Sequence, residues 1–166
     1  MMKFIERRIV GPIKALLLEG ITPQKIALSL ACGIVLGVFP ILGSTTLLCT
    51  LAVLALGLNL PATQLVNYFV YPLQLLLILP FIRAGEFLLR TPRTPLSLPQ
   101  MLAIFNANHL QALRLLWVLA LQGMLAWLVI APFTFFLLYK IFLHSLIRLA
   151  AELQRRRSAR NTQGAA

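Results

Sequence analysis

The chain has 166 residues, of which 60% are hydrophobic and 11% are charged, and its mean hydropathy is +0.88. Soluble domains carry far more charge, so this composition excludes one and is typical of a protein whose apolar segments of about 20 residues cross a bilayer. The 15 Lys and Arg residues outnumber the 4 acidic residues and give a net charge of +11. Because no nucleic-acid-binding motif accompanies this charge, we predict no nucleic-acid partner and interpret the cations as partners of anionic lipid headgroups.

Residues 1–21 mix apolar and basic side chains at helical spacing. The apolar positions recur at steps of three and four residues, and the cations fall largely on the other side. This pattern predicts an amphipathic N-terminal helix that lies in the membrane interface.

Residues 22–58 are predicted to form a first helical hairpin. Thr22 can cap a helix that must end before Pro40, and Ser44 or Thr45 can cap the next helix. The first helix would measure about 20 Å, short of a hydrocarbon core of about 30 Å, whereas one kinked span over the whole stretch would measure about 50 Å. Length therefore favours a hairpin over a single span. The proline placement favours a re-entrant hairpin over two short crossing helices.

Residues 59–90 are predicted to form a second hairpin of the same kind. Asn59 can accept hydrogen bonds from freed backbone amides, and Pro61 can open a helix. Tyr71-Pro72 then breaks that helix before a long apolar helix begins. The layout repeats that of the first hairpin.

The remaining chain divides into three parts. Residues 91–108 contain a proline-rich loop and then an apolar stripe, which predicts another interfacial helix. Residues 109–151 contain two apolar runs on either side of Pro132, which could kink one helix or form the tip of a hairpin; length favours a transmembrane helix pair. A basic tail follows over residues 152–166. The expected fold is a single all-α integral membrane domain, with two re-entrant or short helical hairpins, a transmembrane helix pair and interfacial amphipathic helices.

The cations gather in three clusters, over residues 1–25, 83–114 and 148–160. The positive-inside rule places all three on the cytoplasmic side of the membrane, with both termini there. Each intervening apolar block must then cross the membrane an even number of times, or not at all.

An ordered set of residues, most of them small, proline or polar, runs through the chain: Thr22, Pro23, Ile26, Ala27, Gly33, Gly37, Val38, Phe39, Pro40, Gly43, Thr45, Asn59, Pro61, Ala62, Pro72 and Gly85. This set resembles a bacterial integral-membrane family catalogued as domain of unknown function 2062. Family members usually have Asn before the second proline, where this chain has Tyr71 and places Asn67 one turn earlier. The resemblance implies a small, multi-pass protein of the bacterial inner membrane. Family members are sometimes fused to or encoded with envelope-glycan enzymes, and the resemblance implies no agreed activity.

The sequence offers no set of catalytic residues. It contains no Asp, its Glu residues lie outside the first apolar block, and His109 and His144 lie near expected interfaces. Cys32 and Cys49 lack the spacing and neighbours of a metal site and are interpreted as apolar packing residues. We therefore expect no enzyme activity, no metal and no cofactor.

The polar groups that remain at membrane depth lie at the two proline breaks. Helix amides and hydroxyls around Gly43–Thr46 could meet Asn67 and Tyr71, forming a site of the kind that broken helices build in transporters. Arg83 could add a cation suited to phosphate, or it could be an interfacial arginine paired with Glu86 or lipid. The candidate substrate-binding residues are Pro40, Gly43, Ser44, Thr45, Thr46, Asn59, Asn67, Tyr71, Pro72 and Arg83.

Two functions from different classes fit these features. The first is a transporter or translocase for an anionic substrate such as a phosphate-bearing lipid. The second is a non-transporting membrane adaptor or scaffold for an envelope-biogenesis enzyme. A chain of 18.5 kDa leaves little room for a pathway, so transport would require a homodimer.

Overall fold

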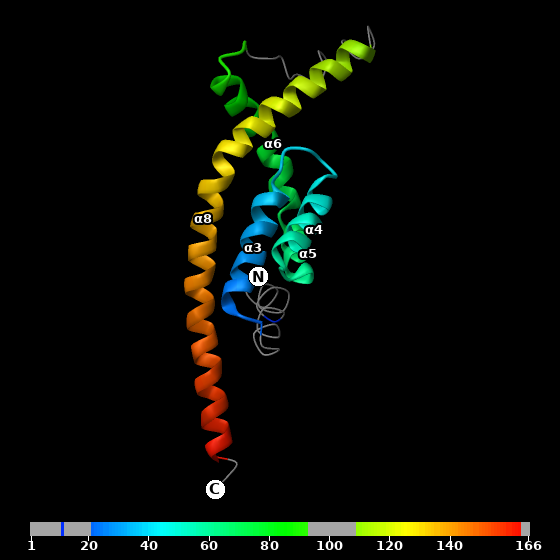
Figure 1. Cartoon of the computed structure of the whole chain (residues 1–166). Coiled ribbons are helices and arrows are strands. Elements are labelled where there is room, and N and C mark those ends of the chain that lie inside the picture. Colours follow the sequence, from blue (N-terminus) through cyan, green and yellow to red (C-terminus); the bar gives the residue numbers. More distant parts are fainter. Residues whose placement is uncertain (1–10, 12–20, 93–108, 164–166) are drawn as a thin grey trace.

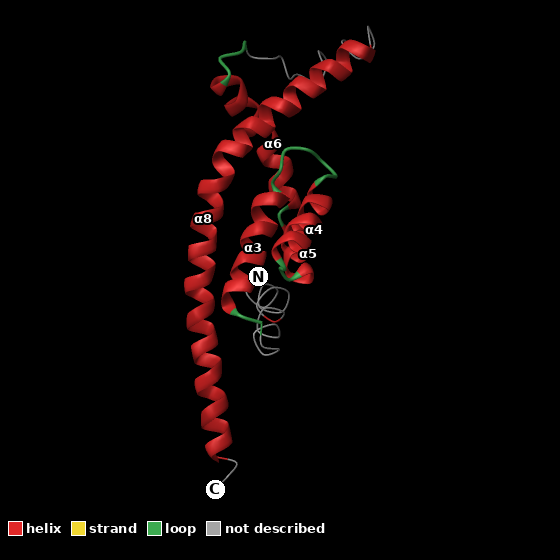
Figure 2. Ribbon diagram, viewed as in Figure 1, coloured by secondary structure: helices red, strands yellow, loops and turns green. Residues whose placement is uncertain are grey.

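The structure, a computed structural model, describes residues 21–92 and 109–163, together with Gly11. All regular structure in this part of the chain is helical, which confirms the all-α class (Figure 2). The helices are α3 (Pro23–Gly37), α4 (Thr45–Leu56), α5 (Leu60–Phe69), α6 (Tyr71–Leu88) and α8 (His109–Gln163). The amphipathic helix predicted over residues 1–21 and the interfacial helix predicted within 91–108 lie outside the described residues.

The first helical hairpin forms as predicted, as α3 and α4. Thr22 caps α3, because its hydroxyl oxygen accepts a hydrogen bond of 3.4 Å from the backbone N–H of Lys25. At the start of α4, Ser44 holds the capping position but donates its hydroxyl to the Ile41 carbonyl at 2.8 Å. Gly57 ends α4 in the left-handed conformation (φ 61°), where a residue without Cβ is favoured.

The second predicted hairpin is wrong, because α5 leads into α6 through a kink. Val70 keeps near-helical angles (φ −85°, ψ −1°) between the two helices. Its N–H donates to the Val66 carbonyl at 3.0 Å, and its carbonyl accepts from the Gln74 N–H at 2.8 Å. Pro72 stands in the first turn of α6, where its missing N–H costs no helical hydrogen bond. The chain therefore restarts the helix after Val70 without folding back.

The predicted helix pair around Pro132 is also wrong. A single α8 runs through Pro132 and continues through the predicted tail as far as Gln163. A proline removes one helical hydrogen bond and can bend a helix, but a tight hairpin also needs turn residues, which the flanking Ala131 and Phe133 do not supply. Figure 1 shows α8 as one bent rod that passes along the other helices and extends beyond them.

Helix α3 packs against α8, and the two helices run antiparallel. Ile26 and Leu30 cluster with Leu146 at one end, and Val38 clusters with Ala126 at the other. Between them, the Trp127 indole donates to the carbonyl oxygen of Val35 at 3.0 Å. Figure 1 shows the same antiparallel course of the two helices.

Glycines allow α3 and α6 to approach their neighbours closely. A Cβ on Gly33 would lie 2.7 Å from the carbonyl oxygen of Thr63, and one on Gly37 would lie 2.6 Å from the Val70 side chain. A Cβ on Gly85 would lie still closer to its neighbour, the backbone of Gln122 in α8. The small residues thus serve packing within the chain.

The cationic clusters do not all lie at one end of the bundle. Lys25 directly precedes Ile26, which packs on Leu146 of α8. Arg148 follows Leu146 by two residues. Arg83 flanks Gly85, which packs on Gln122. Gln122 and Leu146 are about 36 Å apart along α8, so Arg83 of the middle cluster and Arg148 of the C-terminal cluster lie at different levels of the bundle.

The outer surface of the described helices is strongly apolar. Large side chains such as Leu54, Leu76 and Phe133 are exposed by 75%, 72% and 77%. Two helical stretches, Tyr71–Leu88 and His109–Arg155, are long and apolar enough to cross a membrane by length and composition.

Candidate functional site

A stripe of polar residues runs along the inner face of α5 and into α6. Its members are spaced by four or seven residues, which places them on one side of a helix. Thr63 and Gln74 are fully buried, and Asn67 is 3% exposed. We name this stripe the polar seam; it comprises Asn59, Thr63, Asn67 and Gln74.

At its first end the polar seam ties α5 to α3. The buried Ser29 hydroxyl donates to the Lys25 carbonyl at 2.8 Å and accepts from the backbone N–H of Asn59 at 3.0 Å. The Asn59 side chain caps α5 by accepting from the Ala62 N–H at 2.8 Å. The Thr63 hydroxyl donates to the Asn59 carbonyl at 2.9 Å. This end is closed by hydrogen bonds and holds the two helices together.

In the middle, the polar seam reaches the outer surface between α4 and α5. The Asn67 amide donates to the Thr46 hydroxyl at 3.5 Å and to the Gln64 amide oxygen at 3.2 Å. Gln64 in turn donates to the Thr46 carbonyl at 3.1 Å and to the Thr50 hydroxyl at 3.0 Å. Thr46 is exposed and Gln64 half-buried, so polar atoms open here onto an otherwise apolar face.

At its far end the polar seam holds the turn between α3 and α4. The Gln74 amide donates to the carbonyl oxygens of Phe39 at 2.7 Å and Ile41 at 3.4 Å. Its own oxygen, Oε1, is buried and has no hydrogen-bond partner among the described residues. An unpaired buried acceptor costs about 1–3 kcal/mol. It can accept a hydrogen bond from a ligand that carries N–H or O–H.

The profile of one protein family matches residues 7–156 and describes an uncharacterised protein conserved in bacteria, DUF2062. The chain belongs to the DUF2062 family. This confirms the resemblance predicted from the sequence, and the matched region contains the whole polar seam. No curated protein and no solved structure matches the chain significantly.

Several of the candidate substrate-binding residues at the two proline breaks lie together. Thr46 and Asn67 make the contact expected between the two breaks. Thr45 is buried beside Thr46, and Pro40 is buried against Gly123 of α8. The α3–α4 turn and the α5–α6 kink therefore adjoin each other.

Other predicted residues lie apart from the contact between Thr46 and Asn67. Asn59 belongs to the opposite end of the polar seam, and Gly43 is exposed in the turn with open space around its Cα. Tyr71 and Pro72 are exposed. Arg83 lies further along α6.

Two buried glutamines were missed by the sequence reasoning. Gln74 lies seven residues after Asn67, on the same helical face, and this spacing could have identified it. Gln122 is 4% exposed in α8 and donates to the Thr91 hydroxyl at 3.1 Å. No local pattern marks it, because its neighbours in sequence are uniformly apolar.

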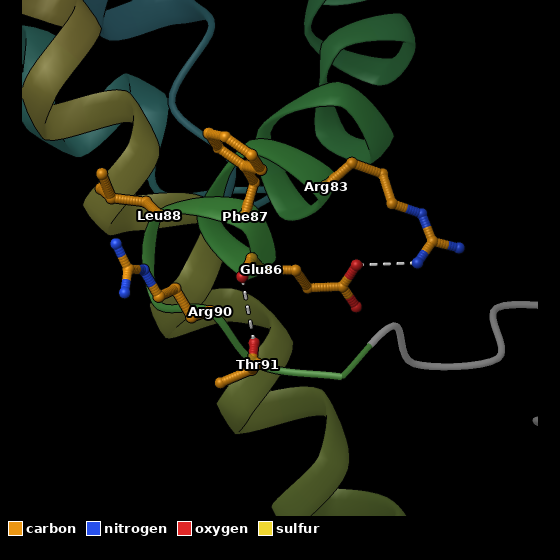
Figure 3. A pocket seen from close by; sticks show the side chains of 6 residues that line it. All are labelled: Arg83, Glu86, Phe87, Leu88, Arg90 and Thr91. Carbon is orange, nitrogen blue, oxygen red and sulfur yellow. Dashed lines mark hydrogen bonds and ion pairs between the residues drawn. The ribbon is translucent and has the colours of Figure 1, made fainter.

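A charged pocket of about 800 Å³ lies at the C-terminal end of α6 (Figure 3). Arg83 and Glu86 form an ion pair there at 2.8 Å, with the carboxylate side chain 2% exposed and the arginine side chain 41% exposed. This is the pairing considered from the sequence as the alternative to a substrate-binding Arg83. Arg90 and Thr91 also line the pocket. In Figure 3 the Arg90 guanidinium points to the side of the helix end opposite the Arg83–Glu86 pair.

The described residues contain no cluster of three metal-ligating side chains. Cys32 and Cys49 are both buried and free.

Proposed function

We propose that the protein is a multi-pass protein of the bacterial inner membrane in which α3, α4, the α5–α6 unit and α8 each cross the bilayer. The exposed leucines and phenylalanines on these helices support this, because lipid tails would cover them without cost. The stretch of α8 from Gln122 to Leu143 measures about 32 Å, close to the thickness of a hydrocarbon core. In this arrangement the α3–α4 hairpin crosses the membrane and does not re-enter it, although its helices, at about 23 and 18 Å, are shorter than the hydrocarbon core.

Charge then assigns the orientation. Lys25 and Arg148 lie at one end of the bundle, and the sequence that flanks them (residues 1–25 and 148–160) carries more Lys and Arg than the sequence around Arg83 and Arg90. The positive-inside rule places the richer end in the cytoplasm, with both termini there. The middle cationic cluster faces the outer side.

Within this frame, we infer that the protein translocates a phosphate-bearing lipid. The observation that carries the proposal is the middle of the polar seam, where Thr46 and Gln64 present polar atoms on an otherwise apolar outer face. Polar groups that face lipid at depth are costly and usually functional. A headgroup could move along these groups while its acyl chains stay in the bilayer.

The chemistry of the polar seam suits a phosphate group. The Thr46 hydroxyl, which borders Asn67 of the polar seam, can donate a hydrogen bond to a phosphate oxygen. The amides of Gln64 and Asn67 and the Thr50 hydroxyl can do the same by exchanging the hydrogen bonds that they donate within the protein. None of these groups is charged, so the lipid is not trapped by a strong ion pair during its passage. The polar seam would therefore lower the barrier to lipid movement without binding the headgroup tightly.

A vesicle assay tests this proposal. Purified protein is reconstituted with fluorescent phosphatidylglycerol, and a membrane-impermeant reductant measures how fast inner-leaflet probe becomes accessible. We expect a rate at least about tenfold above protein-free vesicles. The double variant Gln64→Leu with Asn67→Leu should fall to the protein-free rate.

The matched control is Gln154→Leu, which makes the same change at an exposed position of α8 away from the polar seam and should keep the wild-type rate. Wild-type rates equal to protein-free vesicles, over several phospholipids and polyprenyl phosphates, would contradict lipid translocation.

A second candidate, a membrane adaptor for an envelope-biogenesis enzyme, is favoured by one observation. Phe133, Phe136 and Leu137 of α8 are exposed by 77%, 64% and 62%, a continuous apolar strip that a partner helix could cover. Affinity purification from native membranes should then recover a second protein. Recovery of this chain alone, or only as a homodimer, at several detergent strengths would exclude the adaptor.

A further inference from the structure

An apolar groove adjoins the charged pocket at the end of α6. The groove has a volume of about 450 Å³ and lies along α8, where Leu121, Leu125 and Leu128 form part of its wall. Thr91 lines both the pocket and the groove. One ligand with a polar end and an apolar end could therefore occupy the two together.

Arg90 adopts an unfavourable backbone conformation beside this junction. It is the one non-glycine residue with positive φ (52°) in the described part of the chain. Its N–H donates to the Phe87 carbonyl at 3.2 Å, and the Thr91 N–H donates to the Glu86 carbonyl at 3.0 Å. These two bonds form the helix ending in which glycine is usual, because other residues are strained there. An arginine at this strained position indicates that its side chain has a functional role.

The charge of the pocket supports a particular kind of ligand. Its described lining holds Arg83, Arg90 and Glu86, so two positive charges and one negative charge leave a net charge of +1. Glu86 is buried and paired with Arg83, so it offers little to a ligand ammonium group. The Arg90 guanidinium has no ion-pair partner among the described residues. The pocket therefore matches an anion.

Gln122 provides a further hydrogen-bond acceptor that lacks a donor. It lines the groove and is 4% exposed, and its amide donates to the Thr91 hydroxyl. Its Oε1 atom is buried without a hydrogen-bond partner in the described chain. This oxygen can only accept, so it suits a ligand hydroxyl at the boundary between the pocket and the groove.

We propose that the α6–α8 junction binds one phospholipid of net charge −1 whose headgroup carries hydroxyl groups. The phosphate pairs with Arg90, a headgroup hydroxyl donates to Gln122, and an acyl chain lies in the groove along α8. Phe39 lines the same groove, and its carbonyl accepts from Gln74 of the polar seam. The bound lipid thus lies next to the far end of the polar seam.

This site deepens the proposed function and rests on it for the membrane placement of the chain. It names the lipid class that would be selected, while the polar seam would carry the movement. Binding and movement can fail separately, so they are measured separately.

The test is lipid binding by the full-length protein in detergent, measured by native mass spectrometry with defined lipids. We expect one phosphatidylglycerol to be retained per chain, with an apparent Kd at least about tenfold lower than that for phosphatidylcholine. Arg90→Gly removes the cation and the backbone strain together. It should weaken phosphatidylglycerol binding about tenfold while the melting temperature stays equal or rises.

Two variants complete the design. Arg90→Lys keeps the charge and should retain most of the binding. Arg114→Ala removes an exposed cation of α8 that does not line the pocket or the groove and should bind as the wild type does. The proposal is overturned if Arg90→Gly binds phosphatidylglycerol as the wild type does, or if phosphatidylcholine binds equally well. If selective binding is lost in Arg90→Gly while lipid still moves in the vesicle assay, the junction selects lipid but is not needed for translocation.

Discussion

At the scale of single residues, a few buried amides and glycines decide how the apolar helices fit together. Gln74 joins α6 to the α3–α4 turn through the carbonyls of Phe39 and Ile41. Sequence reasoning predicted the contact between Thr46 and Asn67 because both flank helix breaks. It missed Gln74 because a glutamine within an apolar helix shows its partners only once the neighbouring helices are placed.

Gly85 gives the clearest prediction at this scale. A Cβ at this position would overlap the backbone carbonyl of Gln122, which cannot move without shifting α8. We expect Gly85→Ala to lower the free energy of unfolding by about 2 kcal/mol or more, although alanine is otherwise favoured in a helix by about 0.5–1 kcal/mol. Thermal unfolding in detergent measures this change.

Gly123→Ala is the matched control, because its added Cβ would lie 3.3 Å from the side chain of Pro40. It should change stability far less than the substitution at Gly85. Equal melting temperatures for the two variants would show that α6 and α8 do not approach each other at Gly85.

At the scale of helices, the capping residues correctly predicted where helices begin, whereas Pro72 and Pro132 did not mark places where the chain reverses. Thr22 and Asn59 cap α3 and α5 as expected, because capping depends on neighbours within one turn. Pro72 and Pro132 were both expected to reverse the chain, and both lie within a continuing helical path. A proline weakens a helix locally, but packing against distant helices decides whether the chain turns there.

The continuity of α8 can be measured directly. Spin labels at Leu121 and Ser145, both exposed, lie on either side of Pro132. A continuous helix separates these positions by about 36 Å along its axis, or slightly less if it bends. A hairpin at Pro132 would bring them within about 15 Å, since paired helices lie 8–10 Å apart. Pulsed electron-spin distance measurements distinguish the two, and a short distance would contradict the single α8.

At the scale of the whole molecule, the path of α8 changes the expected topology. Composition was sufficient to predict an all-helical chain, but the even number of crossings in each apolar block depended on placing all three cationic clusters on one side of the membrane. With α8 unbroken, the cations near Arg83 and those near Arg148 lie at opposite ends of an apolar stretch. Local charge counts alone could not separate these arrangements, because they do not reveal how many times the intervening chain crosses.

The most direct test of the membrane arrangement is single-cysteine labelling in intact cells with an impermeant maleimide, in a background in which Cys32 and Cys49 are replaced by Ala. The labelled positions are Leu42 and Arg114 at one end of the bundle, and Leu60 and Arg148 at the other. We predict that cysteines at Leu42 and Arg114 react from outside, whereas those at Leu60 and Arg148 react only after the inner membrane is opened. Labelling of all four positions from the same side would contradict the crossing bundle.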